Sequence, residues 1–520
     1  MIKPPAAGPT APDLPAPPGT APAAPAARDG TRRTPAADGV RPARAAHGTG
    51  PAPAADGRRP VSAADGLRPA ADVTGPGADG AGPAPATDAA DPVLLVEPRD
   101  GVPQPLTTAA ELAEVTARLA AGTGPVAVDA ERASGYRYGQ RAYLVQLRRK
   151  GAGTVLIDPV ELPDLSGLGA ALADAEWVLH AASQDLPCLA EVGMRPRVLF
   201  DTELAGRLLG YEKVGLGAMV ERLLGLTLEK GHSAADWSTR PLPRAWLAYA
   251  ALDVEVLVEL RDLLEAELAA AGKLGWAREE FAAVAAAPPP PPRAEPWRRT
   301  SGIHRVRGRR ALAAVRALWE SRDALARQRD IAPGRVLPDS AIVAAAVADP
   351  TSAEDLSRMP VFSGRQQLRL LRRWYGAVAE ARRLSEAELP LTAVPSDAPP
   401  PPNRWADRDP DAAARLAAAR AALVALSQRH TVPLENLLSP DLVRRLAWQP
   451  PVDRSAVGVA AALRVGGARS WQVELAAPAL AVAMAATADT TAGDTPGGPP
   501  DGPLDGPPGG PTGGPGRAAG

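Results

Sequence analysis

The prediction of the fold begins with Val126-Ala127-Val128-Asp129-Ala130-Glu131. A β-branched apolar run that ends in an acid is typical of a buried β-strand. Because side chains alternate between the two faces of a strand, Asp129 and Glu131 are expected on one face at its C-terminal end. Neighbouring carboxylates repel each other unless a cation lies between them, and a divalent metal that prefers oxygen ligands is the natural candidate. Taken alone, Asp-x-Glu also fits a strand that runs into a solvated acidic turn.

Two more strand-like runs follow this strand. They lie at residues 143–148 and 154–159 and are separated by the turn Lys150–Gly153. Runs joined by a short glycine-containing turn are typical of hairpins, so three consecutive strands are expected to form an antiparallel meander. Upstream of them, Thr107 or Thr108 is placed to cap a helix.

Helices and strands alternate in the next part of the chain. Short buried strands are predicted at 177–182 and 198–201, and a long helix is predicted from Arg244 to about Gly272. A meander followed by alternating helices and strands places this part of the chain among the α/β folds.

Two further acidic residues lie where a catalytic site can use them. Asp185 follows a buried strand and opens a helix, and its alternative role is to cap that helix. Asp253 lies four residues after Tyr249, so both side chains point from one face of a helix. An amphipathic helix with one polar edge explains this pair equally well. Each feature alone therefore favours a structural role.

The acidic residues together favour catalysis. Hydrolysis of a phosphodiester by two metal ions needs several carboxylates to hold cations about 4 Å apart, where one ion activates water and the other stabilises the leaving oxygen. The ordered set Asp-x-Glu, Asp and Tyr-x-x-x-Asp supplies this inventory of ligands.

At this point the sequence resembles the DEDD superfamily of 3′-5′ exonucleases, in its tyrosine-containing branch, and more closely the ribonuclease D family. The resemblance rests on Val128–Glu131, on Leu179–Leu186, and on a third block from Asp236 through Arg240-Pro241-Leu242 to Val254. It covers about residues 93–272. It implies an α/β, ribonuclease H-like fold with a mixed sheet.

The resemblance also implies a role for each residue of the acidic set. Asp129 would bridge two divalent metal ions, either Mg²⁺ or Mn²⁺. Glu131 and Asp253 would complete one metal site, and Asp185 would hold the second ion. Tyr249 would orient the attacking water through its hydroxyl.

This chain departs from the family at two positions. The family usually has Thr between the first two acids and an aromatic residue after the second, whereas this chain has Ala130 and Arg132. Neither change removes a ligand. The missing aromatic residue puts in doubt how the terminal bases of the substrate are separated.

The polar loop at 231–243 contains three candidate nucleic-acid contacts. His232 is expected either to touch substrate or to face solvent. Trp237 and Arg240 belong to the family-like block, and their alternative role is to pack the loop against the following helix. A fourth polar residue, His180, is expected to be a core histidine, because four acids already suffice as ligands.

Two helical units follow the α/β part. The unit at 303–388 resembles the helicase-and-RNase-D C-terminal (HRDC) domain, and residues 408–484 are similar to a degenerate second copy. The first unit has an Arg-rich face that is expected either to contact phosphates or to be a solvated helix surface. The arginines of this face are Arg305, Arg307, Arg309, Arg310, Arg365, Arg369, Arg372 and Arg373.

Domain boundaries are predicted from composition. The 520 residues include 59 Pro and 49 Gly, concentrated at the ends and in two internal stretches. Segments with few apolar side chains cannot offset the entropy lost on folding. The expected parts are a disordered tail at 1–92, an exonuclease domain at 93–272, a Pro-rich linker at 286–302, an HRDC domain at 303–388, a second linker at 389–407, a helical domain at 408–484 and a disordered tail at 485–520. Pro288–Pro292 predicts a stiff spacer that few contacts cross.

Location and partners are also predicted. The chain has one cysteine, Cys188, and neither a long apolar segment nor the layout of a signal peptide, so a cytoplasmic protein with no membrane partner is expected. The formal net charge is −1, so any contact with nucleic acid must come from local patches.

The leading functional hypothesis is a metal-dependent 3′-5′ exoribonuclease that trims the 3′ ends of structured RNA, with transfer-RNA precursors implied by the family. One alternative is a DNA 3′-5′ exonuclease in repair. Another is a nucleic-acid-binding scaffold whose exonuclease site is inert. The retained acids and Tyr249 argue against the scaffold, because an inert site is free to lose them.

Overall fold

The computed structural model describes residues 92–229, 231–289, 291–394 and 397–492. The tail predicted at 1–92, apart from residue 92, and most of the tail predicted at 485–520 lie outside these residues. Helix α20 (Ser470–Ala492) continues past the predicted end of the last helical unit. Across the described ranges, none of the helices combines the length and the apolar character needed to cross a membrane.

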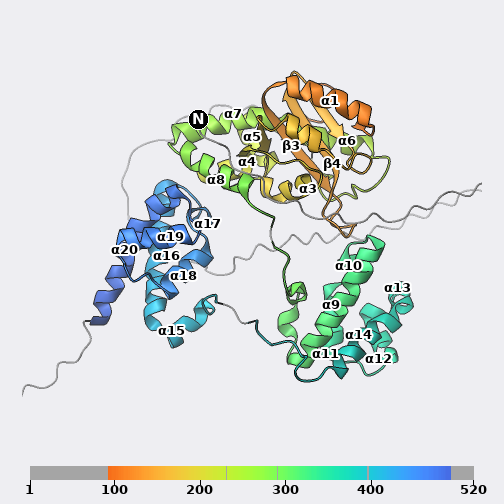
Figure 1. Cartoon of the computed structure of the whole chain (residues 1–520), viewed down its shortest axis with the longest axis vertical. Helices are drawn as coiled ribbons and strands as arrows, with labels where there is room; N and C mark the ends of the chain where they lie inside the picture. Colours follow the sequence, from red (N-terminus) through yellow and green to blue (C-terminus); the bar gives the residue numbers. More distant parts are fainter. Residues whose placement is uncertain (1–91, 230, 290, 395–396, 493–520) are drawn as a thin grey trace, which may run out of the picture. The chain divides into compact units, whose positions relative to one another are not determined.

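A six-stranded mixed sheet forms the centre of the α/β part (Figure 1). Strands β3 (Thr123–Arg132), β4 (Ala142–Lys150) and β5 (Gly153–Ile157) pair antiparallel, which confirms the predicted meander. Strands β6 (Glu176–Leu179) and β7 (Val198–Asp201) continue parallel from β3. A short strand, β1 (Val93–Leu95), lies outside this sheet and pairs with β8 (Leu226–Leu228). The order across the sheet is β2 (Pro105–Leu106), β5 (Gly153–Ile157), β4 (Ala142–Lys150), β3 (Thr123–Arg132), β6 (Glu176–Leu179) and β7 (Val198–Asp201).

Eight helices surround the described sheet. Thr108 caps the first of them in a capping box with Glu111, as the sequence predicts. The sheet residues Leu144 and Leu156 pack with Leu247 of α6, on the sheet face that also carries Asp129 and Glu131. The helices are α1 (Ala109–Ala121), α2 (Ser166–Ala171), α3 (Leu186–Glu191), α4 (Thr202–Leu209), α5 (Leu216–Leu224), α6 (Arg244–Glu255), α7 (Leu257–Ala270) and α8 (Leu274–Ala286).

The long helix predicted from Arg244 to Gly272 is two helices, because α6 ends before Val256 and α7 begins after it. The α/β core also extends past residue 272. Phe281 of α8 is buried, and its ring centroid lies 4.8 Å from that of Phe200 on β7. The α/β part therefore continues to the end of α8.

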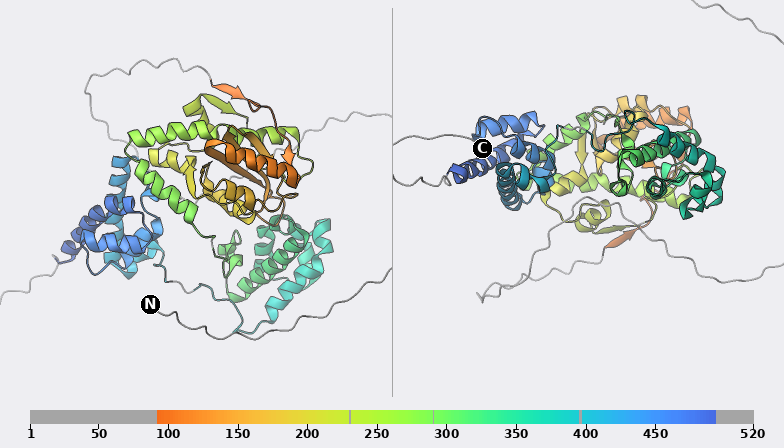
Figure 2. Two further views of the ribbon diagram at one scale, coloured as in Figure 1. Left: turned by 45° about the horizontal axis from the view of Figure 1, so that its top comes forward. Right: turned by 90° about the horizontal axis from the view of Figure 1, so that it is seen from below.

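The first helical unit has its own core around Leu318, Ile342, Phe362 and Trp374. Pro338 precedes α11, and a short 3₁₀ turn begins at Pro360, so the predicted breaks are present. Its helices, green to teal in Figure 2, are α9 (Arg309–Arg329), α10 (Pro333–Val336), α11 (Asp339–Ala348), α12 (Ala353–Arg358), α13 (Arg365–Arg369) and α14 (Leu371–Arg383).

The second helical unit begins with a buried tryptophan, Trp405, whose ring packs at 4.9 Å on Trp448. Its helices, blue in Figure 2, are α15 (Trp405–Arg408), α16 (Pro410–His430), α17 (Leu434–Leu437), α18 (Pro440–Trp448), α19 (Ala456–Val465) and α20. The unit therefore starts before the predicted boundary at residue 408.

Both helical units contact the α/β part, so the expectation that few contacts cross the Pro-rich spacer is wrong. The amide of Ala332 donates to the carbonyl of Tyr136 at 2.9 Å. In the second unit, the ring of Trp471 stacks on Trp276 of α8 with centroids 4.9 Å apart. If the spacer were the only link between the units, neither the hydrogen bond nor the aromatic contact would form.

Candidate active site

Three carboxylates from two elements meet beside the end of β3. Oxygen atoms of Asp129, Glu131 and Asp253 all lie within 4.8 Å of one another. The two residues on β3 are two positions apart and so share a face of the sheet, and Asp253 comes from α6, which covers that face. The three acids line one cavity of about 590 Å³, called here the acid pocket.

Asp185 lines the same pocket from the segment that follows β6. It is the N-terminal flanking residue of α3, yet its side chain makes no capping hydrogen bond with that helix. Its carboxylate instead lies 3.3 Å from the guanidinium of Arg132. Helix capping, the alternative role considered from the sequence, therefore does not account for this residue.

The turn that precedes Asp185 depends on a residue that was not predicted to belong to the site. Ala181 adopts a left-handed conformation with φ of 58°, which is uncommon for a residue with a Cβ. The buried carboxylate of Asp201 accepts hydrogen bonds from the amides of Ala181 and Ala182 at 3.1 and 2.9 Å. Asp201 thus supports the turn that delivers Asp185. In the sequence, the only sign of this role is that Asp201 is an acid at the end of the strand predicted at 198–201.

Burial and mutual repulsion shape the electrostatics of the pocket. Burial raises the pKa of Asp129 to about 6, and burial together with the nearby Asp129 raises the pKa of Asp185 to about 8. The pKa values of Glu131 and Asp253 are raised well above the usual range, first by burial and then by the charge of Asp129. Four carboxylates held in this way are poised to bind cations.

Tyr249 lies one helical turn before Asp253 on α6, and its hydroxyl hydrogen-bonds the Asp253 carboxylate. Burial and the adjacent carboxylates raise the pKa of this phenol, so it stays protonated and keeps its O–H donor. The sequence placed both residues on one helix face, and the structure directs that face into the acid pocket.

The structure gives the loop candidates Trp237 and Arg240 a packing role instead of a substrate contact. Trp237 is fully buried and packs 5.4 Å from Trp246, so it cannot stack on a base. Arg240 forms a two-pronged ion pair with the buried Asp158, at 2.6 and 2.8 Å. Its other donors reach the carbonyls of Trp237, Thr239 and Tyr143, so all five N–H groups of its guanidinium are engaged.

The two histidines near the pocket differ in exposure and contacts. His232 is partly exposed, and its ring lies edge-on to Tyr249 with centroids 5.7 Å apart. His180 lines the acid pocket and shares a hydrogen bond of 2.9 Å between Nδ1 and Thr202. Burial lowers the pKa of His180 to about 4, so its imidazole is neutral near pH 7.

The Arg-rich face of the first helical unit divides into two groups. Arg309 donates to the carbonyls of Glu386 and Leu389, and Arg310 donates to that of Arg382 at 3.1 Å. These arginines tie the end of the unit together, so the structure does not leave them free for phosphates. Arg373 likewise donates to Ser321. The exposed arginines of this face whose side chains make no hydrogen bond or ion pair to another described residue are Arg305, Arg365, Arg369 and Arg372.

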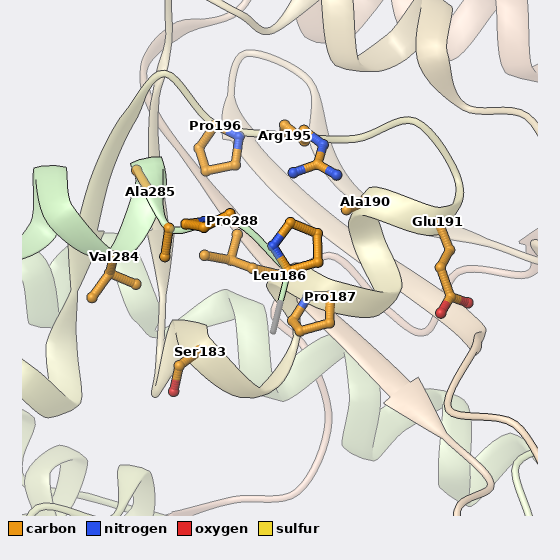
Figure 3. Close-up of a pocket in the computed structure, with 12 residues that line it drawn as sticks. Ser183, Leu186, Pro187, Ala190, Glu191, Arg195, Pro196, Val284, Ala285 and Pro288 are labelled. Carbon is orange, nitrogen blue, oxygen red and sulfur yellow. The ribbon is translucent and has the colours of Figure 1, made fainter. Parts of the chain in front are cut away.

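A second groove lies between α3 and the end of α8 (Figure 3). Leu186, Pro187 and Pro288 line it, with Glu191 and Arg195 as its charged residues. A single carboxylate among apolar side chains does not suit a divalent metal, which takes several oxygen ligands. The acid pocket is therefore the candidate for hydrolytic chemistry.

Comparisons with known proteins identify the family of this chain. Residues 103–269 match a family model described as a 3'-5' exonuclease. Residues 398–484 match a 3' to 5' exonuclease C-terminal domain, and residues 311–378 match an HRDC domain. Fold, acid pocket and matches together define a 3′-5′ exonuclease.

Ribonuclease D of Acidiphilium cryptum is 34% identical over 324 residues, which are 59% of this chain and 80% of that protein. The chain belongs to the ribonuclease D family.

Two solved structures extend this comparison. A protein from Bifidobacterium adolescentis is 40% identical, with a TM-score of 0.70 over 76% of this chain and 100% of that one. Ribonuclease D of Escherichia coli, an exoribonuclease involved in structured RNA processing, is 27% identical, with a TM-score of 0.56 over 74% and 98% of the two chains. The ribonuclease H-like fold and the recognition of the family are confirmed.

Membership of this family makes the chain a 3′-5′ exoribonuclease, a hydrolase that binds RNA. The cluster of hard carboxylate oxygens in the acid pocket suits divalent metal ions. The last helical unit matches an exonuclease C-terminal domain, which refines the expected second HRDC copy.

Proposed function

We propose that the acid pocket holds two divalent metal ions, Mg²⁺ or Mn²⁺, for removing nucleotides from RNA 3′ ends. The observation that carries this proposal is the convergence of Asp129, Glu131 and Asp253 within 4.8 Å in a pocket that Asp185 also lines. Asp129, Glu131 and Asp253 would hold one ion, and Asp129 and Asp185 would hold the other. Bound metal lowers the pKa of water and offsets negative charge at the phosphate.

The residues of the chain orient the reactants. The hydroxyl of Tyr249 stays protonated beside Asp253, where it positions the attacking water. The neutral imidazole of His180 adds no positive charge that would compete with the metal ions. Arg132 holds the Asp185 carboxylate in place from the end of β3.

The proposed substrate is the 3′ end of structured RNA, including transfer-RNA precursors. Its support is the likeness to Escherichia coli ribonuclease D, together with the exposed arginines Arg365, Arg369 and Arg372 on the HRDC unit. Exposed guanidinium groups bind phosphates without reading sequence, which suits a processing enzyme that meets many RNAs.

The test uses the purified full chain with Mg²⁺ or Mn²⁺ on RNA labelled at either end. A 3′-5′ exonuclease releases a labelled mononucleotide from 3′-labelled RNA at once and shortens 5′-labelled RNA step by step. Asp129→Asn keeps the side-chain volume but removes a charged ligand, so activity falls at least about 10²-fold. Asp174→Asn, which changes an exposed carboxylate outside the pocket, is the matched control.

Three results would count against the proposal. Near-normal turnover by Asp129→Asn would reject the ligand assignment. Equal rates on matched DNA would favour the DNA exonuclease, because the 2′-hydroxyl would then have no influence. A wild-type protein that binds RNA but releases no nucleotide with either metal would support the inert scaffold.

A further inference from the structure

Arg132 lies where two cavities join. It is the last residue of β3, directly after Glu131, and lines both the acid pocket and a neighbouring cavity of about 260 Å³. The neighbouring cavity is formed by the end of β3, the loop around Tyr136 and the loop around Ala234. Ala130, Glu131, Arg132 and Ser233 belong to both cavities. A strand of RNA that reaches the acids through this opening passes the Arg132 side chain.

The guanidinium of Arg132 is held in position by the segment that carries Asp185. One terminal nitrogen donates to the carbonyl of Gln184 at 2.7 Å, and the other lies 3.3 Å from the Asp185 carboxylate. These contacts connect β3 to the turn before α3. A guanidinium held at two points loses less freedom when it binds a further group than an unattached side chain does.

Arg132 still has donors to offer. A guanidinium carries five N–H groups, and the contacts to Gln184 and Asp185 engage two of them. The side chain remains 27% exposed. Arg240 is the opposite case, since all five of its donors are engaged by Asp158 and nearby carbonyls. Arg132, which lines the acid pocket, therefore has the unused donors that Arg240 lacks.

The charge balance of the pocket gives these donors a purpose. Five carboxylates line it: Asp129, Glu131, Asp185, Glu229 and Asp253. Among the described residues of the lining, Arg132 alone carries a permanent positive charge. A phosphodiester that approaches such a surface is repelled unless cations face it. Arginine suits this task because its planar fork matches two phosphate oxygens.

We propose that Arg132 binds a phosphodiester at the 3′ end of the RNA, at the junction of the acid pocket and the neighbouring cavity. The inference rests on the proposed function and adds a substrate-binding residue to the acidic set. Arg132 uses the donors that Gln184 and Asp185 leave unused. Its contact is with one backbone linkage and not with a base, so the effect is the same for different terminal sequences.

The experiment measures RNA binding with Ca²⁺ in place of Mg²⁺, and a gel confirms that the RNA keeps its length. The dissociation constant is compared for wild type, Arg132→Met and Arg132→Lys, on RNA and on RNAs with one neutral methylphosphonate near the 3′ end. Arg132→Met weakens binding to unmodified RNA about 10-fold or more, since a charge-assisted contact is lost. It also reduces the salt slope by about 1. Arg132→Lys keeps the slope but binds less tightly than wild type.

Methylphosphonate scanning identifies the contact. In wild type, neutralising the linkage that Arg132 binds weakens affinity, and in Arg132→Met the same change has almost no further effect. Neutralising the other linkages weakens both proteins equally. Arg195→Met is the control, because Arg195 lines the separate apolar groove. Circular dichroism establishes that each variant is folded.

Two outcomes would overturn the proposal. The first is that methylphosphonate and Arg132→Met act independently at every linkage. The second is unchanged RNA affinity together with weaker Mn²⁺ binding, measured by calorimetry without RNA, which would make Arg132 only a positioning residue for Asp185. Neither measurement needs hydrolysis. If the wild-type protein bound RNA without degrading it, the proposed function would be rejected, and the binding data would still test the role of Arg132.

Discussion

Asp129 on β3 lies directly opposite Gln146 on β4, and Gln146 is completely buried. Directly opposed residues of an antiparallel pair project from the same face of the sheet with Cβ atoms about 5 Å apart. Neither the Nε2 nor the Oε1 atom of Gln146 has a hydrogen-bond partner among the described residues. A buried amide without partners is costly, because its polar atoms have lost their hydrogen bonds to water.

The first prediction concerns this pair. Gln146→Leu preserves shape and removes the unpaired amide, so the metal-free protein should gain about 1 kcal/mol or more in its free energy of unfolding. Because the amide makes no hydrogen bond to Asp129, Mn²⁺ affinity should stay close to that of the wild-type protein. Chemical denaturation in EDTA and titration calorimetry measure the two effects. Gln428→Leu, at an exposed helix position, is the control. A less stable variant, or one that binds Mn²⁺ more weakly than wild type, would contradict this prediction.

The second prediction separates metal binding from the positioning of water. Tyr249→Phe removes only the hydroxyl that bonds Asp253. We expect kcat to fall roughly 10²-fold or more, in the range for one positioned catalytic group, while Mn²⁺ affinity is retained. Single-turnover assays and calorimetry provide both numbers. If Tyr249 only packs against Trp237, the substitution will leave kcat nearly unchanged.

The third prediction is a pH dependence from His180, whose pKa is lowered from 6.5 to about 4 by burial. Between pH 6.5 and 4 the unfolded chain takes up a proton that the folded imidazole resists, so this residue makes the protein less stable as pH falls through that window. His180→Gln removes this contribution. The difference in melting temperature between variant and wild type should be constant above pH 7 and should move in favour of the variant between pH 6.5 and 4. A difference that does not change with pH would contradict the assignment.

The fourth prediction tests whether α8 belongs to the α/β core. Phe281 is buried against Phe200, so Phe281→Ala should cost about 3–5 kcal/mol of stability through the cavity it leaves. Leu263→Ala, at a partly exposed position of α7, should cost much less. Urea unfolding followed by circular dichroism measures both. Equal losses would show that α8 packs only loosely on the sheet.

Much of the site follows from local geometry. The two-residue period of a strand puts Asp129 and Glu131 on one face, and the four-residue spacing on a helix puts Tyr249 and Asp253 on another. The hairpin of β4 and β5 was predictable because a short turn that contains glycine joins the two strands. The prediction drawn from the Pro-rich spacer was wrong. Composition indicates the stiffness of a segment but not the contacts between the units on either side of it, such as that of Ala332 with Tyr136.

The sequence by itself determined which acids share a strand face and which tyrosine shares a helix face with an acid, since these depend on residue type and on backbone periods that span a few positions. Only the tertiary structure decided which arginines are free. Arg240 meets Asp158 across 82 positions of sequence, and Arg132 reaches the segment of Asp185 across more than 50. Partners this far apart are set by how strands and helices pack, because no local period relates them. The same packing leaves Arg240 fully engaged and Arg132 with donors to spare.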